Sequence, residues 1–360
     1  MTINSGDDDR RTEILMVTTD APPMTYCTVL RSRRSVIAMF VFTLLVVSQV
    51  SAQQTQTTQP ATSNRAPGPR TDTSDRQVNR WDIVHASPLD HPLHVRIVVP
   101  RNVNRGKPTD RPPLVVFIHG GGWQGGSYTS KYCDWLTEHG FAIASIQYRL
   151  TDVACFPAQV HDCKSAMRYL RANADRYGYN ATRIGVAGSS AGGYLALMLG
   201  VTNGVASLEG EIGEHDEVSS RVDAVVDFYG ASDFVHRSTN QPHKTEQRDG
   251  PVRKLLGTAV KADIPLARFA SPITHVSKDD PPLMVIHGMQ DKTVLVDQAQ
   301  RMIAAYQKKQ FALELEPHLI PGAGHGGAEF RTQEIRDAIV SFLRRHLGQN
   351  PGEVTESPRG

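Results

Sequence analysis

The sequence predicts an α/β fold, in which a mainly parallel, twisted sheet carries helices on both faces and a small cap insertion. Segments of strand length alternate with segments of helical periodicity, the order that builds parallel sheets. Several strand segments are almost wholly apolar and rich in Val and Ile, as expected for strands covered on both faces. The chain has 360 residues, 39% of them hydrophobic, which suffices for one large core.

Residues 1–52 are predicted to be a signal peptide. A basic cluster, Arg31–Arg34, precedes an apolar run from Val36 to Val47, and small residues follow at Ser51 and Ala52. About a dozen apolar residues is short for a membrane span, which takes about twenty. A cleaved signal and a secreted or periplasmic location are therefore favoured, with an uncleaved membrane anchor as the alternative. Because residues 1–30 make an unusually long leader, we expect the true start at Met24.

Low-complexity segments flank the predicted domain. Residues 53–79 are rich in Gln, Thr, Ser and Pro and contain almost no large apolar side chains. Such a segment cannot bury enough surface to offset its ordering entropy, so it is predicted to be a flexible linker. The domain is expected to occupy residues 80–347 and to begin near Trp81. Residues 348–360 are predicted to be a disordered tail.

The charges and cysteines exclude some classes of function. With 39 basic and 37 acidic side chains and no basic stripe, no nucleic-acid partner is predicted. No Cys or His cluster has metal-site spacing, and neither a metal nor an organic cofactor is predicted. Outside the predicted signal peptide lie Cys133, Cys155 and Cys163. Three buried thiols are favoured, and a Cys155–Cys163 disulfide is the alternative.

The predicted elements follow from the periodicity of apolar residues. Strand-length runs occur at Leu93–Val99, Leu114–His119, Phe141–Tyr148, Arg183–Ala187, Val222–Tyr229, Leu283–His287 and Leu313–Leu319. Helical stretches occur at Pro157–Tyr177, Ser190–Gly200, Val294–Lys309 and Glu329–Leu347. Residues 231–276 interrupt this alternation, because they are polar and carry three histidines. We expect this segment to be an insertion or small cap over the site.

The pattern Gly188-Ser-Ser190-Ala-Gly192 lies between a predicted strand and a predicted helix. A serine at a sharp strand-to-helix turn has a strained backbone, and glycines two residues away on either side avoid clashes there. The helix N-terminus also offers N–H groups to a developing negative charge. Ser190 is therefore the predicted nucleophile. Ser189 is a less fitting rival, because glycines do not flank it in this way.

A second glycine-rich pattern, His119-Gly-Gly-Gly-Trp123, ends an upstream strand. Acyl transfer passes through an oxyanion, which needs preorganised donors about 3 Å away. The N–H groups of Gly121 and Gly122, with that of Ala191, are the predicted donors of an oxyanion hole. We expect His119 to orient this loop rather than to act as a base.

The serine needs a histidine base and a carboxylate that orients the histidine. Where the nucleophile lies at such a strand-to-helix turn, the chain order is serine, then acid, then histidine. His325 lies in a glycine-rich loop after the last predicted strand and is the predicted base, whereas His318 lies within the strand. Asp291 follows the preceding strand and is the predicted acid. Asp297 and Asp233 are the weaker alternatives, and Asp233 fits a turn or helix cap better.

Together these residues resemble the hormone-sensitive-lipase-like branch of the α/β-hydrolases, and within it the bacterial bifunctional diacetyl/feruloyl esterase-like proteins. The similar stretches cover most of residues 81–347 and are His119–Trp123, Ser145–Leu150, Phe156–Asp162, Arg183–Gly193, Ser271–His275 and Gly322–Gly327. The resemblance implies an α/β-hydrolase fold, an oxyanion hole at Gly121, Gly122 and Ala191, and a triad of Ser190, Asp291 and His325.

Two details of the resemblance concern single residues. Met289-Gln290 stands where relatives often have an acidic and a small residue, but this departure leaves Asp291 in place. Arg149 and Asp162 also match, and a buried ion pair or a helix-positioning role explains them without catalysis.

The predicted function is hydrolysis of carboxylic esters through an acyl-enzyme, on short-chain or aryl esters such as acetyl or feruloyl esters. The predicted partner is a small-molecule or polysaccharide ester. Specificity is expected to depend on residues 231–276 and on Trp123 and Tyr128, the predicted substrate-binding residues. A serine peptidase or amidase, and a non-catalytic binding module, are the alternatives.

Overall fold

The computed structural model describes residues 77–101, 106–308 and 313–348. The predicted signal peptide, the predicted linker up to residue 76 and the predicted tail from residue 349 lie outside these ranges. Within them, no helix combines the length and the apolar character needed to cross a membrane.

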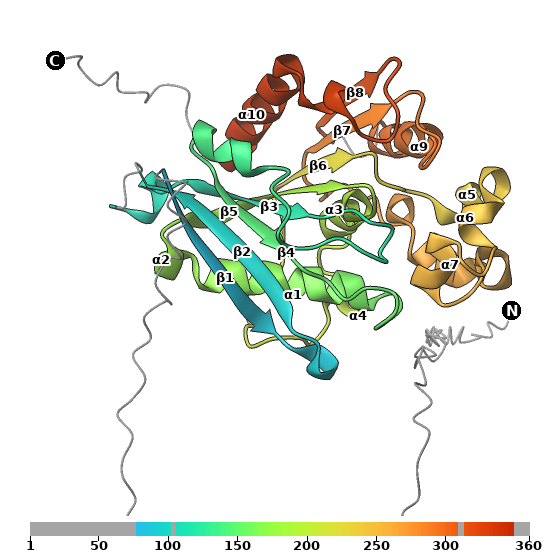
Figure 1. The fold of residues 1–360 in the computed structure, drawn as a ribbon, viewed down its shortest axis with the longest axis horizontal. Helices are drawn as coiled ribbons and strands as arrows, with labels where there is room; N and C mark the ends of the chain where they lie inside the picture. Colours follow the sequence, from blue (N-terminus) through green and yellow to red (C-terminus); the bar gives the residue numbers. More distant parts are fainter. Residues whose placement is uncertain (1–76, 102–105, 309–312, 349–360) are drawn as a thin grey trace, which may run out of the picture.

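The centre of the molecule is an eight-stranded sheet with the order β1-β2-β4-β3-β5-β6-β7-β8 (Figure 1). The strands are β1 Val78–Ala86, β2 Leu93–Pro100, β3 Pro113–Ile118, β4 Ala142–Ile146, β5 Asn180–Ser189, β6 Ala224–Phe228, β7 Leu283–Gly288 and β8 Leu315–Ile320. β1, β2 and β4 pair antiparallel, and all pairs from β4 to β8 are parallel. The predicted, mainly parallel sheet is confirmed.

The first strand was not predicted. β1 starts at Val78, inside the stretch expected to be linker, and pairs along its length with β2. Its apolar and polar side chains are interspersed; Val78, Trp81 and His85 are buried, and most of the others are half-buried. An edge strand of this kind lacks the apolar run that marks the inner strands.

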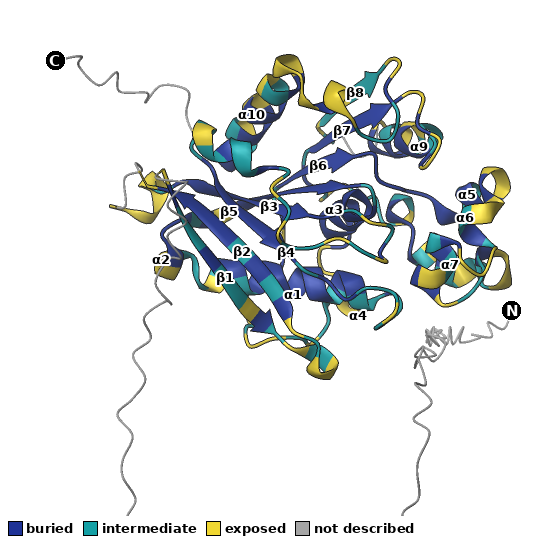
Figure 2. Ribbon diagram, in the orientation of Figure 1, coloured by how far each residue is buried: buried dark blue, intermediate teal, exposed yellow. Residues whose placement is uncertain are grey.

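Two apolar clusters cover the two faces of the sheet, because alternate strand residues point to opposite sides. The α3-side cluster contains Val116 and Ile118 and packs on α1 Ala158–Ala172, α2 Ala174–Tyr177, α3 Ala191–Val201, α4 Ala206–Glu209 and α9 Asp297–Tyr306. The α10-side cluster contains Val115 and Phe117 and packs on α10 Gln333–Leu347 and the 3₁₀ helix Asp134–His139. Figure 2 shows the strands as the buried layer between them.

Two of the predicted helices differ from the observed ones. The stretch Pro157–Tyr177 forms two helices, α1 and α2, because Asn173 leaves the helical conformation between them. The stretch from Glu329 begins with a short 3₁₀ turn, and α10 starts only at Gln333, where the Thr332 side chain caps Ile335 N.

Residues 231–276 fold into four short α-helices, α5 Phe234–Asn240, α6 Pro242–Thr245, α7 Pro251–Leu256 and α8 Ile264–Phe269. Several of their apolar side chains, Phe234 and Leu255 among them, are fully buried. Lys254 Nζ donates to Gln124 Oε1 at 2.6 Å, and Phe156 N donates to Leu255 O at 2.7 Å. The segment therefore packs against the glycine-rich loop that follows β3.

Two further expectations concern single contacts. Arg149 Nη2 and Asp162 Oδ1 lie 2.7 Å apart in a buried ion pair, which ties the chain after β4 to α1. The candidate Cys155–Cys163 disulfide is wrong, because Cys163 is a free thiol, buried within the α3-side cluster. The favoured prediction, three buried thiols, is confirmed for Cys133 and Cys163, whereas Cys155 is only half-buried.

Candidate active site

Ser190 lies at the turn between β5 and α3 in an unusual backbone conformation. Its φ is 56° and its ψ is −114°. Its N–H donates to Phe228 O at 2.8 Å, which fixes the turn to the end of β6. A positive φ is uncommon for residues other than glycine and is concentrated at functional sites.

The glycines on either side of Ser190 make this turn possible. A Cβ atom on Gly188 would lie 2.1 Å from Gly192 O, and one on Gly192 would lie 2.0 Å from Ile118 O. Both contacts are with backbone, which cannot move aside as a flexible side chain could. The close packing of β3, β5 and α3 therefore requires glycine at both positions.

Ser190, His325 and Asp291 come together from three separate segments. His325 Nε2 lies 2.8 Å from Ser190 Oγ, and His325 Nδ1 lies 2.6 Å from Asp291 Oδ2. The Asp291 side chain is fully buried, whereas 22% of the His325 side chain is exposed. The structure thus places the predicted nucleophile, base and acid in one hydrogen-bonded series.

Asp291 is surrounded by hydrogen-bond donors. Its Oδ1 accepts from Thr293 N at 2.7 Å and Val294 N at 3.0 Å, and His287 Nε2 lies 3.4 Å from its Oδ2. Burial by itself raises the pKa of this carboxyl, but the bonds with His287, His325 and Val294 outweigh it and hold the pKa well below its usual range. Asp291 is consequently a carboxylate at any working pH.

The glycine-rich loop after β3 lies directly against Ser190. Gly121, Gly122 and Trp123 have positive φ values of 117°, 60° and 58°. A Cβ atom on Gly120 would lie 2.8 Å from Ser189 O and 3.3 Å from Ser190 Cβ. The loop backbone can approach the serine this closely only without a side chain at that position.

His119 holds the start of this loop. Its Nδ1 lies 2.8 Å from Gly120 O, and its ring stacks on Tyr148 with centroids 4.4 Å apart. Burial lowers the pKa of His119, although its bond with Gly120 acts in the opposite direction. His119 is therefore a neutral, buried side chain that orients the loop.

Tyr229 contacts the site but was not predicted. Its φ is 47°, and its ring lies 4.6 Å from that of His325. Its position at the end of the predicted strand Val222–Tyr229, next to a glycine, was the available signal. The positive φ and the ring contact become visible only in the fold.

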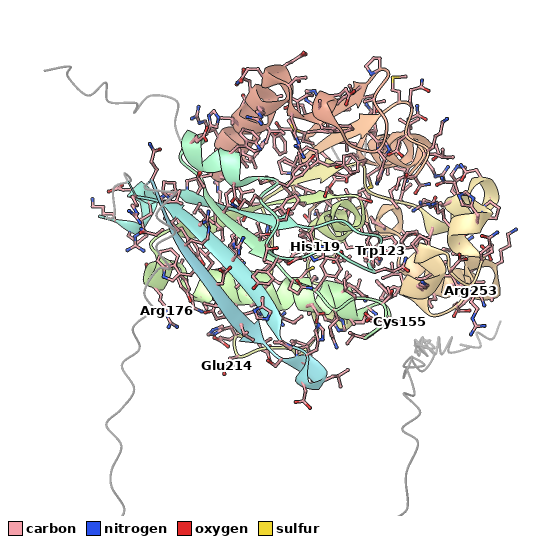
Figure 3. The ribbon with its side chains drawn as sticks, in the orientation of Figure 1. His119, Trp123, Cys155, Arg176, Glu214 and Arg253 are labelled. Atoms are coloured by element: carbon pink, nitrogen blue, oxygen red, sulfur yellow. The ribbon has the colours of Figure 1, made fainter. Side chains whose placement is uncertain are left out.

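The predicted substrate-binding residues lie elsewhere. Trp123 is only 3% exposed and packs edge-on against Tyr194 and Phe234, in the interior beside α3 (Figure 3). Tyr128 stacks on His94 of β2, with ring centroids 4.8 Å apart. Neither side chain contacts Ser190, Asp291 or His325 among the interactions of the described residues.

The alternative acids and histidine are engaged in other contacts. Asp297 Oδ2 lies 2.8 Å from His236 Nε2, and the Asp233 side chain caps α5 and pairs with Arg301. His318 lies 3.1 Å from Glu316. In the ranges that the structure describes, these groups do not reach Ser190.

Known proteins resemble this chain both in sequence and in structure. The BD-FAE family model matches residues 103–306. Esterase LipC of Mycobacterium tuberculosis is 35% identical over 250 residues, which is 66% of this chain and 59% of that protein. The chain spans 59–60% of the length of the first curated relatives that it matches.

Solved structures with the same fold include two esterases. A truncated form of a carbohydrate esterase from gut microbiota has a TM-score of 0.69 and 29% identity, over 79% of this chain and 100% of that one. The propionate-bound esterase Est2 of the planctomycete Thermogutta terrifontis has a TM-score of 0.61 and 26% identity, over 75% and 96% of the two chains. With the BD-FAE match covering more than half of its residues, the chain belongs to the BD-FAE family of hormone-sensitive-lipase-like α/β-hydrolases.

Proposed function

We propose that this chain is a serine carboxylic-ester hydrolase that works through an acyl-enzyme. The observation that carries the proposal is the hydrogen-bonded series from Ser190 Oγ through His325 to the buried carboxylate of Asp291. This is the arrangement that activates a serine hydroxyl on many unrelated folds. The names of the related proteins, which are esterases, support the same reaction.

In the first half of the proposed reaction, Ser190 Oγ attacks the ester carbonyl carbon while His325 Nε2 takes the hydroxyl proton. The carbonyl π electrons move to oxygen and form a tetrahedral oxyanion. When the oxyanion collapses, the bond to the alcohol oxygen breaks, and His325 returns the proton to that oxygen. Asp291, bonded to Nδ1, holds the ring orientation and stabilises its positive charge.

The oxyanion would be stabilised by the N–H groups of Gly121, Gly122 and Ala191. Ala191 is the first residue of α3, so its N–H has no partner within the helix. The contact of the glycine-rich loop with Ser190 supports a contribution from the other two. In the second half, water replaces the alcohol, His325 takes its proton, and collapse of the new oxyanion releases the acid and restores Ser190.

Short-chain or aryl esters, such as acetyl or feruloyl esters, are the proposed substrates. The propionate bound to one structural relative and the description of another as a carbohydrate esterase support this range. The proposed natural partner is a small-molecule or polysaccharide ester, and the proposed location is outside the cytoplasm. The proposed chemistry uses side chains, backbone N–H groups and water, and it requires neither a metal nor an organic cofactor.

The test is hydrolysis of p-nitrophenyl acetate combined with labelling by a fluorophosphonate. Ser190→Ala should lower kcat by roughly 10⁴-fold or more while the thermal unfolding midpoint stays close to that of the wild type. The probe should label the wild type at Ser190. Ser189→Ala is the matched control, because it removes the neighbouring hydroxyl and should still be labelled.

The same measurements separate the alternatives. Absence of labelling at Ser190 in folded protein would identify a binding module instead of an enzyme. Labelling together with faster cleavage of amides than of matched esters would identify a peptidase or amidase.

A further inference from the structure

A cavity of about 450 Å³ adjoins the candidate active site on the α10 side of the sheet. It lies between the loop that leads into the 3₁₀ helix Asp134–His139 and the beginning of α10. Its lining combines aromatic with basic side chains and includes no carboxylate. A second cavity, of about 610 Å³, is lined by residues 203–220 together with Arg168. Neither lining includes Ser190, Asp291 or His325, but residues of the 450 Å³ cavity contact neighbours of these three.

The 450 Å³ cavity shares its segments with the site. One wall continues the glycine-rich loop after β3, and another continues the chain beyond His325. Phe228 forms part of the lining, and its carbonyl accepts the N–H of Ser190. Phe330, also in the lining, lies 4.9 Å from the Tyr229 ring, which in turn contacts His325. One aromatic side chain, Tyr229, therefore lies between a wall of this cavity and His325.

Two arginines that line the cavity lie over aromatic rings. The Arg331 guanidinium carbon lies 5.5 Å from the Tyr132 ring centroid, and that of Arg336 lies 5.0 Å from the Trp135 centroid. Stacking occupies a guanidinium face but leaves its in-plane N–H groups available to a carboxylate.

The positive charge of the cavity is not neutralised by the described part of the chain. Lys131, Arg331 and Arg336 form no ion pair with a described carboxylate, and the buried Nε of Arg336 has no hydrogen-bond partner there. Three cations around a space large enough for one ring-sized group make a site suited to an anion.

We propose that this cavity binds a carboxylate on the part of the substrate that lies beyond the scissile ester. This inference rests on the proposed esterase function and narrows its substrates to acidic esters, such as acetylated sugars that carry a carboxylate. Stacked guanidiniums lose little freedom when they bind a carboxylate in two-point fashion, so they favour this group over a neutral one of the same size.

The test compares 4-acetoxybenzoate with 4-acetoxybenzamide, which share the acetyl ester and differ in the remote charge. The wild type should prefer the acid in kcat/KM by about tenfold, the effect expected of one charge-assisted hydrogen bond. Arg331→Gln should bring the ratio of the two kcat/KM values close to one. Arg336→Gln should lower it in the same direction, and hydrolysis of neutral p-nitrophenyl acetate should change little in either variant.

Arg176→Gln is the matched control for charge. Arg176 is exposed on α2, stacks on Tyr177 with 5.6 Å between guanidinium carbon and ring centroid, and lies on the α3 side of the sheet (Figure 3). Its replacement should leave the acid-to-amide ratio unchanged, although it alters the net charge equally.

Several outcomes would overturn the inference. Equal kcat/KM values for the two esters in the wild type would do so while leaving the esterase function intact. A wild-type preference that survives both Arg331→Gln and Arg336→Gln would mean that other residues recognise the charge. A wild type that hydrolyses neither ester and is not labelled at Ser190 would contradict the proposed function itself.

Discussion

The two halves of the candidate site are held in place by different physical means. The Ser190 turn and the glycine-rich loop depend on backbone contacts too close for any side chain, as at Gly188, Gly192 and Gly120. Asp291 and His325 are instead held by hydrogen bonds and by the Tyr229 ring. Substitutions in the first half should therefore disrupt the site through steric strain. Substitutions in the second half should do so by removing a charge or the orientation of the imidazole.

The largest expected effect is on the backbone half. Gly192→Ala would place a Cβ atom 2.0 Å from Ile118 O, so β3 or α3 must move. We expect the free energy of unfolding to fall by about 3 kcal/mol or more and kcat with p-nitrophenyl acetate to fall below detection. Urea unfolding and initial rates measure the two effects.

Gly125→Ala provides the matched control, since a Cβ atom there would meet nothing within 4 Å. It should keep both the stability and the activity of the wild type. A Gly192→Ala protein as stable and active as the Gly125→Ala protein would disprove the steric interpretation.

The next effect is on the side-chain half. Asp291→Asn keeps the shape of the side chain but removes its charge and its preference for the right imidazole tautomer. We expect kcat to fall roughly 10⁴-fold, with a small change in KM. Asp297→Asn is the control, because Asp297 bonds to His236 instead and should keep near wild-type kcat. Similar losses in both variants would show that Asp291 has no special role.

A smaller effect concerns the pH dependence of stability and the buried carboxyl of Asp227 on β6. Burial raises the pKa of Asp227 to about 6, and the nearby His287 ring and the bond from Gly230 N offset this rise only in part. The folded protein thus holds this proton more tightly than the unfolded chain. The free energy of unfolding should fall by about 3 kcal/mol as the pH rises from about 4 to above 6.

Asp227→Asn should abolish this loss of stability while keeping an acceptor for Gly230 N. Urea unfolding at pH 4 should show little difference between the variant and the wild type, and at pH 7 the variant should be more stable. An equal difference at both pH values would mean that protonation of Asp227 is not the cause.

The backbone half could be predicted from sequence because its determinants are local. The glycines at fixed spacing around Ser190 and after the third strand indicate the positions at which a side chain cannot fit. Asp291 and His325 could also be located, since each follows a recognisable strand. Their mutual distances depend on the register of β7 and β8, which no short pattern contains.

The parts that the sequence did not predict depend on distant contacts. β1 is a strand because β2 pairs with it, not because its own residues are apolar. Trp123 was expected at the substrate, but the packing of Tyr194 and Phe234 places it in the interior. Tyr229 meets His325 across an interval of almost a hundred residues, so no local signal connects them.

The two fully buried thiols, Cys133 and Cys163, lie on opposite faces of the sheet, in the α10-side and α3-side clusters respectively. Burial raises the pKa of both thiols, so neither offers a reactive thiolate while its face stays packed. Each becomes available to an alkylating reagent only when the helices on its own side separate from the strands. The rates of alkylation at Cys133 and Cys163 would therefore report how often each side of the molecule opens, without any engineered label.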